Sequence, residues 1–407
     1  MKEELISVLM VNYNHEDTIK EAIKSVLNQT YTNIQFIIVD DGSTDASCRI
    51  ATSFNDSRIE LYHLEKNEHI CYATNFGFSK IRGRYLARID SDDIWYPDKL
   101  NKQLALMQKN KGCKICFTWC DWIDEKGKVI NDKVPDLVRL CNKNYQKQSE
   151  WLNHFYYEGN CLLHSSVLMG AELVKETGLF EPAYRQLHDF DYWVRIAKKY
   201  NLFVIPEPLI AMRRYLSDKD RNASAVTEQN TTRTFNEFMN IRSSFFENMS
   251  DEVFVESFGA QFRCQDSKKK KEIECEKAFL LCKPQNGWNG VPPEGLRRLK
   301  NLFKDINDKE LLEKKYNFSI KDLYELSVNH IYNDPIQQQT YINLEQNYSN
   351  AEKMVDFLEK QISILEREKV EIQEEMNRRI SLYANSTSWK LTKPLRKLGE
   401  SLRKLRN

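Results

Sequence analysis

The sequence predicts an α/β domain on a mostly parallel central sheet, followed by a helical region and a C-terminal coiled coil. Short apolar runs alternate with amphipathic helical stretches from residue 5 to about residue 130. Charged helical segments dominate from about residue 216 to about residue 330, and a 4-3 spacing of apolar residues follows. The early runs are apolar enough to be buried on both faces, which is typical of parallel sheets covered by helices.

Composition limits the classes of function. The chain has 407 residues and is 41% hydrophobic, enough for two or three folded units. A formal net charge of +1 gives no reason to expect a nucleic-acid partner. No apolar run is long enough to cross a membrane, and the first run has acidic flanks, so we interpret it as a strand, not a signal peptide. Ten cysteines without a secretory signal favour free thiols and a cytoplasmic location.

The first elements are expected in the order strand, helix, strand. Predicted strands cover residues 6–11, 34–40, 59–64 and 84–90, and the stretches between them have helical periodicity. The polar turns NYN, DDGSTD and DSDD each follow a strand. Since ligands bind beyond the carboxyl ends of parallel strands, these turns should meet in one crevice.

Later elements of the domain are more mixed. Residues 114–130, KICFTWCDWIDEKGKVI, predict a strand, a turn at Lys126–Gly127 and a return. The cysteines of this segment lack a matching second pair at zinc-ribbon spacing, so we interpret them as buried thiols. Residues 201–215, NLFVIPEPLIAMRRY, end the mixed region.

Two acidic clusters follow predicted strands. Asp90, Asp92 and Asp93 lie in RIDSDD, where like charges repel unless a cation lies among them. Oxygen ligands of this kind suit Mn²⁺ or Mg²⁺, although an acidic helix start is the plainer alternative. Asp40 and Asp41 lie in VDDGSTD, where helix capping explains the hydroxyl residues but not both carboxylates. Such a turn has groups that could contact a base or a phosphate.

These motifs resemble those of family 2 glycosyltransferases. The resemblance rests on VNYNHEDTIKEAIKSVLNQTY, FIIVDDGSTD and NFGFSKIRGRYLARIDSDDIWYPDKL, and covers about the first 110 residues, continuing more weakly to about residue 215. It implies the GT-A fold, a nucleotide-sugar donor and a divalent cation.

The resemblance also implies roles for the donor-side residues. Asp41, with Asp40 beside it, resembles the carboxylate that reads the pyrimidine base of the donor. Val11, Asn12 and Tyr13 resemble the loop that flanks the base, with Val11 and Asn12 replacing the usual proline and small hydroxyl residue.

The acidic pair of the family has a counterpart here. Asp90 and Asp92 resemble the DxD pair that meets the ribose and the cation, and Asp93 is an alternative to Asp92 as direct ligand. Arg213 and Arg214 are candidates to clamp the diphosphate, with surface ion pairing as the alternative. Related enzymes carry a histidine where Tyr215 stands, which puts a third metal ligand there in doubt.

A third motif lies in LHDFDYW, residues 187–193. Asp189 takes the position of the family's catalytic base, and His188 stands where glutamate is more usual. An acceptor hydroxyl must lose its proton as it attacks, so the chemistry needs such a carboxylate. Helix capping is the structural alternative for this pair. His188 and Trp95 are expected on the acceptor side, although core packing explains Trp95 equally well.

The C-terminal part lies outside the resemblance. Lys369 and Arg379 break an otherwise regular 4-3 spacing of apolar positions, which are Leu344, Tyr348, Ala351, Val355, Leu358, Ile362, Leu365, Ile372, Met376 and Tyr383. These apolar positions predict a coiled coil and a homodimer, against the alternative of a long helix packed on its own domain. The basic tail from Trp389, with leucines at helical spacing, suits an anionic membrane surface or is a plain solvated helix. The predicted divisions are 1–215, 216–335, 340–383 and 384–407.

We therefore predict an inverting, metal-dependent, non-processive glycosyltransferase. Its donor would be a UDP-sugar, and its acceptor a glycan or lipid-linked glycan in surface polysaccharide synthesis at the cytoplasmic face of a membrane. A non-catalytic scaffold with the same fold is one alternative, but it would need none of Asp90, Asp92 or Asp189. A nucleotidyltransferase is another, but the first loop lacks the glycine-rich basic sequence that such enzymes carry.

Overall fold

The structure is a computed structural model that describes residues 4–217, 221, 222, 225, 227–284, 291–328 and 335–405. The chain divides into two compact units, Met1–Ile336 and Gln337–Asn407. The predicted boundary between residues 215 and 216 stays a prediction.

The first unit contains an eight-stranded sheet. Its strands are β1 (Ile6–Asn12), β2 (Ile34–Asp40), β3 (Ile59–His63), β4 (Tyr85–Asp90), β5 (Ile94–Trp95), β6 (Ile115–Ile123), β7 (Leu168–Gly170) and β8 (Phe203–Arg213). They lie in the order β3-β2-β1-β4-β7-β6-β8-β5. The first four strands of this order are parallel, whereas β7 is antiparallel to both of its neighbours. This mixed, mostly parallel sheet is the predicted α/β fold.

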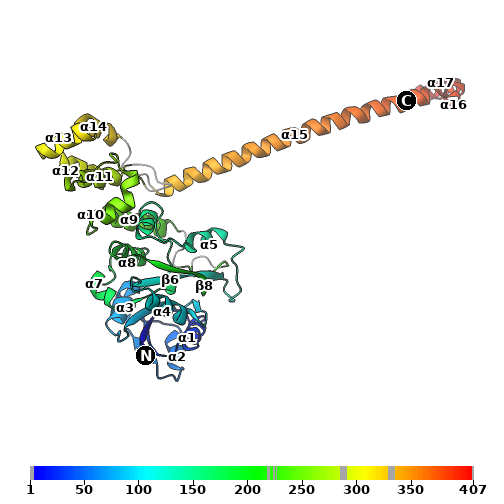
Figure 1. Cartoon of the computed structure of the whole chain (residues 1–407). Helices are drawn as coiled ribbons and strands as arrows, with labels where there is room; N and C mark the ends of the chain where they lie inside the picture. Colours follow the sequence, from blue (N-terminus) through cyan, green and yellow to red (C-terminus); the bar gives the residue numbers. More distant parts are fainter. Residues whose placement is uncertain are drawn as a thin grey trace. The chain divides into compact units, whose positions relative to one another are not determined.

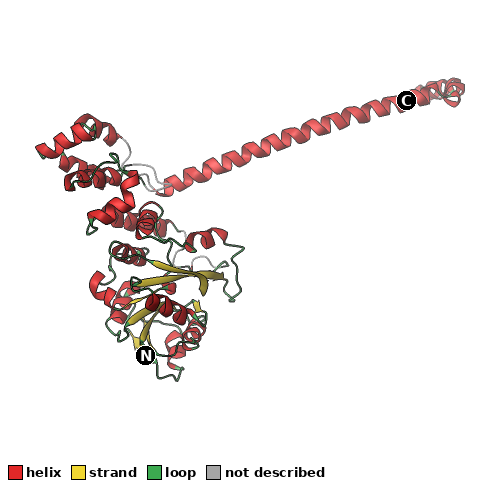
Figure 2. Cartoon of the chain, in the orientation of Figure 1, coloured by secondary structure: helices red, strands yellow, loops and turns green. Residues whose placement is uncertain are grey.

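Both faces of the sheet are covered by helices (Figures 1 and 2). Along β1, Val8 and Met10 pack into one core, and Leu9 and Val11 pack into the other. Helices α1 (Ile19–Leu27), α2 (Ser47–Thr52) and α4 (Lys99–Lys109) contribute to the first core. Helices α3 (His69–Phe78), α6 (Gln148–Tyr157), α7 (Glu172–Thr177) and α8 (His188–Ala197) contribute to the second. Burial on both faces explains why the strands read as continuous apolar runs.

The region after the sheet is helical, as predicted. Its helices are α9 (Glu228–Ser243), α10 (Asp251–Phe258), α11 (Lys270–Leu281), α12 (Pro293–Leu302), α13 (Ile306–Lys315) and α14 (Ile320–Val328). Phe238 of α9 and Phe245, two residues after its end, share a core with Trp151 and Phe190 of the α/β part, whereas a separate small core joins α11 to α14. The α/β part therefore buries apolar surface against the first of these helices.

The second unit consists of helices. Helix α15 (Pro335–Asn385) begins two residues before it and has 51 residues, which corresponds to a length of about 76 Å. Helices α16 (Thr387–Leu391) and α17 (Lys393–Lys404) follow. Across the described ranges of both units, no helix combines the length and apolar character needed to span a membrane.

Candidate functional site

The predicted turns meet at one edge of the sheet. Strands β3, β2, β1 and β4 are neighbours, and at their carboxyl ends Asp40 pairs in register with both Asn12 and His63, while Val11 pairs with Asp90. Because the strands run in parallel, the loops that follow them lie side by side. Segments that are far apart in the sequence thus form a single polar edge.

Asp40 holds two of these loops together. It is only 1% exposed, and its Oδ2 accepts a hydrogen bond from Asn12 Nδ2 at 2.7 Å. Its Oδ1 accepts one from the Ser43 backbone N–H at 3.0 Å and lies 2.8 Å from His63 Nδ1. The asparagine that departs from the family pattern therefore bridges the first two loops.

Asp41 is held beside Asp40 by a tight turn. Its Oδ1 accepts a hydrogen bond from the Glu68 backbone N–H at 2.8 Å, and burial raises the pKa of its carboxyl group. The next residue, Gly42, has a φ of +71°, and a Cβ there would lie 2.5 Å from the carbonyl carbon of Lys66. This turn therefore requires glycine.

The first loop offers two kinds of surface. Val11 and Asn12 are buried, whereas Tyr13 is 42% exposed. Asn12 Oδ1 is buried and has no hydrogen-bond partner in the part of the chain that the structure describes. Of these three residues, only Tyr13 presents an exposed side chain to a ligand.

Asp90 forms an ion pair with a buried arginine, Arg88, which the sequence analysis did not identify as a site residue. Arg88 is 2% exposed, and its guanidinium donates to Asp90 Oδ1 at 3.2 Å and to Thr74 Oγ1 at 2.6 Å. Its sequence signal was an arginine inside an apolar run predicted to be a buried strand. Because buried charges are normally paired, such a residue predicts a nearby carboxylate partner. Arg88 thus orients Asp90, whose side chain is 33% exposed.

Asp92 and Asp93 differ in what they contact. Asp93 is 2% exposed and accepts hydrogen bonds from Ser165 Oγ at 2.5 Å and from the Arg213 backbone N–H at 3.1 Å. Ser165 Oγ also accepts a hydrogen bond from the Asp90 backbone N–H at 2.9 Å. Ser165, which lies in the short segment before β7, therefore connects Asp90 to Asp93. Asp92 is half-buried, and within the described ranges its carboxylate accepts no hydrogen bond from another residue. Burial raises the pKa of both carboxyl groups, and for Asp93 the neighbouring carboxylates raise it further.

The prediction that Arg213 clamps a diphosphate is wrong for this conformation. Its guanidinium is already engaged: it donates to the backbone oxygens of Asp92, Asp124 and Glu125 and to the Glu21 carboxylate. Arg213 therefore ties β8 to the acidic loop, since β8 ends beside that loop. For the adjacent Arg214, burial lowers the guanidinium pKa, and its role toward a diphosphate stays a prediction.

The prediction that Trp95 contacts the acceptor is also wrong for this conformation. Trp95 is 2% exposed, and its Nε1 donates to the Ser165 carbonyl at 2.9 Å. Lys99 Nζ lies 3.9 Å from the centroid of its ring. Trp95 is a core residue because the short strand β5 turns it inward, so it offers no face to a sugar.

Asp189 is the second residue of helix α8. Its Oδ2 accepts a hydrogen bond from Asn160 Nδ2 at 3.1 Å, and its Oδ1 accepts one from the Phe190 N–H at 2.7 Å. Burial raises the pKa of the Asp189 carboxyl group, His188 opposes this, and the charge of Asp90 adds to it. The effect of Asp90 on the Asp189 pKa indicates that the carboxylates of the second and third motifs lie within electrostatic range of each other.

His188, the first residue of α8, lies near a second histidine, His164. The rings of His164 and His188 have centroids 5.5 Å apart, and His164 stacks on Phe180 at the same separation. Burial lowers the pKa of both imidazoles, so both are neutral near pH 7. His188 is half-buried and precedes Asp189 in the chain, and its role toward the acceptor stays a prediction.

Glu237 of α9 holds the segment that leads into α8. Its carboxylate accepts hydrogen bonds from the backbone N–H groups of Arg185 (2.8 Å), Gln186 (2.8 Å) and Leu187 (2.7 Å). The side chain is buried, with 6% exposed. No motif marks this residue, since its partners lie about 50 positions earlier. A residue of the helical region therefore positions the helix that carries Asp189.

Comparison with known proteins gives one consistent result. Residues 7–170 match the family described as Glycosyl transferase family 2. The chain is 30% identical over 234 residues to the uncharacterized glycosyltransferase MJ1057 of Methanocaldococcus jannaschii, a match that covers 56% of this chain and 77% of that protein. It is 28% identical over 253 residues to the uncharacterized glycosyltransferase RP339 of Rickettsia prowazekii, covering 62% and 74%.

Among solved structures, the chain is similar to S. aureus TarS 1-349 in complex with UDP-GlcNAc. The match covers 79% of this chain and 89% of that chain, with a TM-score of 0.50 and 15% sequence identity. At this identity the similarity concerns the fold alone.

Proposed function

The chain belongs to glycosyl transferase family 2, and from this premise we propose that it is an inverting glycosyltransferase whose donor is a nucleotide diphosphate sugar. One observation carries the proposal. Asp41, the Asp90–Asp92 pair and Asp189 come from three separate motifs, and the loops of the first two share one edge of the sheet while Asp189 interacts with Asp90. A scaffold would not need carboxylates in this arrangement.

The proposed reaction divides the work among these residues. Asp41 contacts the base of the donor, and Arg88 holds Asp90 toward the ribose. Asp90 and Asp92 would hold Mn²⁺ or Mg²⁺, which when bound neutralises the departing diphosphate. Asp189 takes the proton of the acceptor hydroxyl as that oxygen attacks the anomeric carbon from the opposite face, which inverts the configuration. Its raised pKa makes it a stronger base than an ordinary aspartate, and Asn160 fixes its orientation.

A UDP-sugar is the proposed donor, the nucleotide class present in the TarS structure. The test is to incubate the full chain with Mn²⁺ and a panel of nucleotide sugars, and to measure hydrolysis and the shift in melting temperature. A ligand present at 100 times its Kd stabilises the folded state by about 2.7 kcal/mol, which a melting curve detects. Failure of every sugar nucleotide to bind or be hydrolysed would contradict the proposal.

We expect Asp92→Asn to weaken Mn²⁺ binding at least tenfold, because its carboxylate is the one free to ligate. Asp93→Asn should keep Mn²⁺ binding but lower the free energy of unfolding by about 1–3 kcal/mol, since a buried hydrogen-bonding group loses its acceptor. Calorimetric titration with Mn²⁺ and urea unfolding separate the two effects. The reverse pattern would make Asp93 the ligand.

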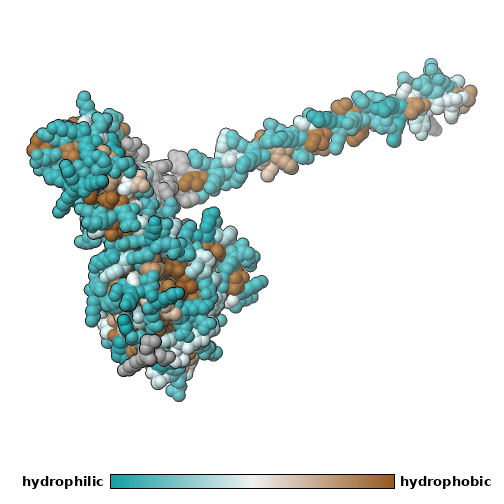
Figure 3. Space-filling view, viewed as in Figure 1, coloured by the Kyte–Doolittle hydropathy of each residue, from teal (hydrophilic) through white to brown (hydrophobic). Residues whose placement is uncertain are grey.

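The second unit supports a proposed homodimer. The apolar residues of the predicted coiled coil are exposed on α15, for example Leu358 at 51%, Ile362 at 55% and Leu365 at 61% (Figure 3). Exposed apolar residues at heptad spacing are stabilised when a second helix covers them. We propose a second copy of this chain as that partner.

The tail supports a proposed contact with an anionic membrane, where a lipid-linked acceptor for surface polysaccharide would lie. Helix α17 is basic, and Leu395, Leu398 and Leu402 are 60–72% exposed at helical spacing. Such a helix lies in the headgroup region with its leucines buried.

Removal of residues after 340 is expected to yield a monomer that no longer binds anionic vesicles but still hydrolyses the donor. The reason is that the dimer and membrane surfaces lie in α15 and α17, whereas the candidate site lies in the first unit. Light scattering and vesicle sedimentation measure the two losses. A truncated chain that stays dimeric would show that the coiled coil does not form the dimer.

A further inference from the structure

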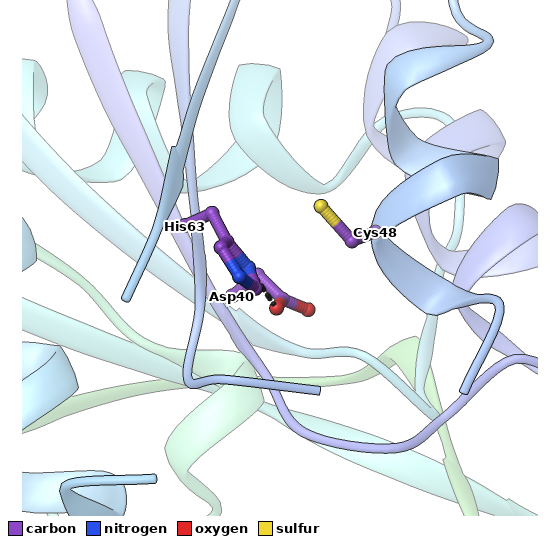
Figure 4. A group of neighbouring side chains, drawn as sticks. All are labelled: Asp40, Cys48 and His63. Carbon is purple, nitrogen blue, oxygen red and sulfur yellow. Dashed lines mark hydrogen bonds and ion pairs between the residues drawn. The ribbon is translucent and has the colours of Figure 1, made fainter. Parts of the chain in front are cut away.

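Three side chains of different chemistry meet at the β2–β3 end of the polar edge (Figure 4). Asp40 ends β2, Cys48 lies in α2, and His63 ends β3, and each offers one ligand atom within 4.8 Å of the other two. His63 Nδ1 is already 2.8 Å from Asp40 Oδ1. The group thus combines one oxygen, one sulfur and one nitrogen donor.

The donor set selects a class of cation. Hard ions such as Mg²⁺ prefer oxygen ligands alone, whereas a thiolate and an imidazole favour Zn²⁺ and similar transition metals. Cys48 must lose its thiol proton to bind a metal. The resulting thiolate and the Asp40 carboxylate together carry two negative charges, which balance a divalent ion. This chemistry differs from that of the Asp90–Asp92 pair, which offers only oxygens.

Neighbouring groups orient the Asp40 carboxylate, and the exposed His63 side chain gives an ion access from solvent. Asn12 Nδ2 donates to the second oxygen of Asp40 at 2.7 Å, and the Ser43 N–H donates to the first at 3.0 Å. Partners of this kind orient a carboxylate ligand. The His63 side chain is 49% exposed, which gives an ion access and leaves a coordination position for water.

We propose that Asp40, Cys48 and His63 form a binding site for a soft divalent transition cation of the Zn²⁺ type, separate from the Asp90–Asp92 pair. The bound ion would join α2 to the ends of β2 and β3. The proposal does not depend on the proposed transferase activity, because binding is measured without nucleotide.

The experiment is to titrate the full chain with Co²⁺, an optical substitute for Zn²⁺, and to record its absorption spectrum. The wild-type chain should give visible bands of a low-coordinate Co²⁺ site and a near-ultraviolet thiolate-to-metal band. Cys48→Ser should abolish the thiolate band, and both Cys48→Ser and His63→Gln should weaken Zn²⁺ binding at least tenfold in competition with a chromophoric chelator.

Matched controls identify the site. Cys264 is also partly exposed and free, so Cys264→Ser should keep the thiolate band, and Asp92→Asn should keep Zn²⁺ affinity. Melting curves without metal establish that the variants fold, and His63→Gln alters a half-exposed side chain that the core does not need. A thiolate band that survives in Cys48→Ser, or equal Zn²⁺ affinity in wild type, Cys48→Ser and His63→Gln, would overturn the proposal.

Discussion

Replacing Asp189 with asparagine is expected to lower the rate of sugar transfer by about two to four orders of magnitude while donor affinity stays within a few-fold. Asparagine has nearly the same shape and keeps an oxygen for Asn160, but it cannot accept the proton of the acceptor hydroxyl. Because burial raises the Asp189 pKa, the wild-type rate should fall with decreasing pH sooner than for an exposed aspartate. Measurements of kcat over a pH series, with calorimetric titration of the donor, check both parts.

Asp191→Asn is the matched control for this prediction. Asp191 lies on the same helix two residues later, and its carboxylate accepts a hydrogen bond from Arg195 Nε at 2.9 Å. Its loss should affect stability more than transfer. If Asp189→Asn reduces donor binding and transfer equally, Asp189 is not the base.

Replacing Glu237 with alanine is expected to lower the free energy of unfolding by about 2–5 kcal/mol and to reduce transfer as well. Three backbone N–H groups lose their acceptor, and an unsatisfied buried donor costs about 1–3 kcal/mol, reduced where water enters. The segment that starts α8 then loses its fixed position, so Asp189 should be misplaced while the donor-side loops are unaffected. Urea unfolding and the ratio of kcat to donor affinity measure the two effects.

Two control variants test whether the effect of Glu237→Ala comes from the lost hydrogen bonds. Glu237→Gln keeps one acceptor oxygen and should lie between alanine and the wild type in both measurements. Glu228→Ala removes an exposed carboxylate from the same helix and should change stability by no more than about 0.5 kcal/mol. Unchanged unfolding of Glu237→Ala would mean that these hydrogen bonds do not hold the segment.

Much of the fold follows from local pattern. The apolar runs of β1, β2 and β4 are buried on both faces, whereas the edge strand β3 is only half-buried. The helices between these strands show a 3.6-residue period. Such periodicity depends on each residue's neighbours along the chain, so it is readable without knowing the tertiary contacts. The helical region was predicted only as helical, because its packing on α6 and α8 leaves no local signature.

In the candidate site, the sequence motifs identify the carboxylates but not the residues that bind them. Asp90 and Asp93 occur within one short motif, yet the Asp93 carboxylate is engaged by Ser165 and Arg213, which lie 72 and 120 positions away. Arg213 and Trp95 were given ligand-binding roles because their types suit them, and the structure buries both. A residue's type and spacing do not reveal which distant partner already occupies it.

The sequence by itself determined which carboxylates reach the polar edge, because parallel strands carry their following loops to the same side of a sheet. Only the tertiary structure decided which of those groups are free to act and which hold the fold together. Among the residues that the structure describes, it left the Asp92 carboxylate without a hydrogen-bond donor, engaged Asp93, and bound Glu237 to the segment before α8. It also joined Asp40, Cys48 and His63 into one cluster. The physical reason is that hydrogen bonds and burial depend on distances in space, which residues far apart in the chain acquire only when the sheet and its covering helices pack.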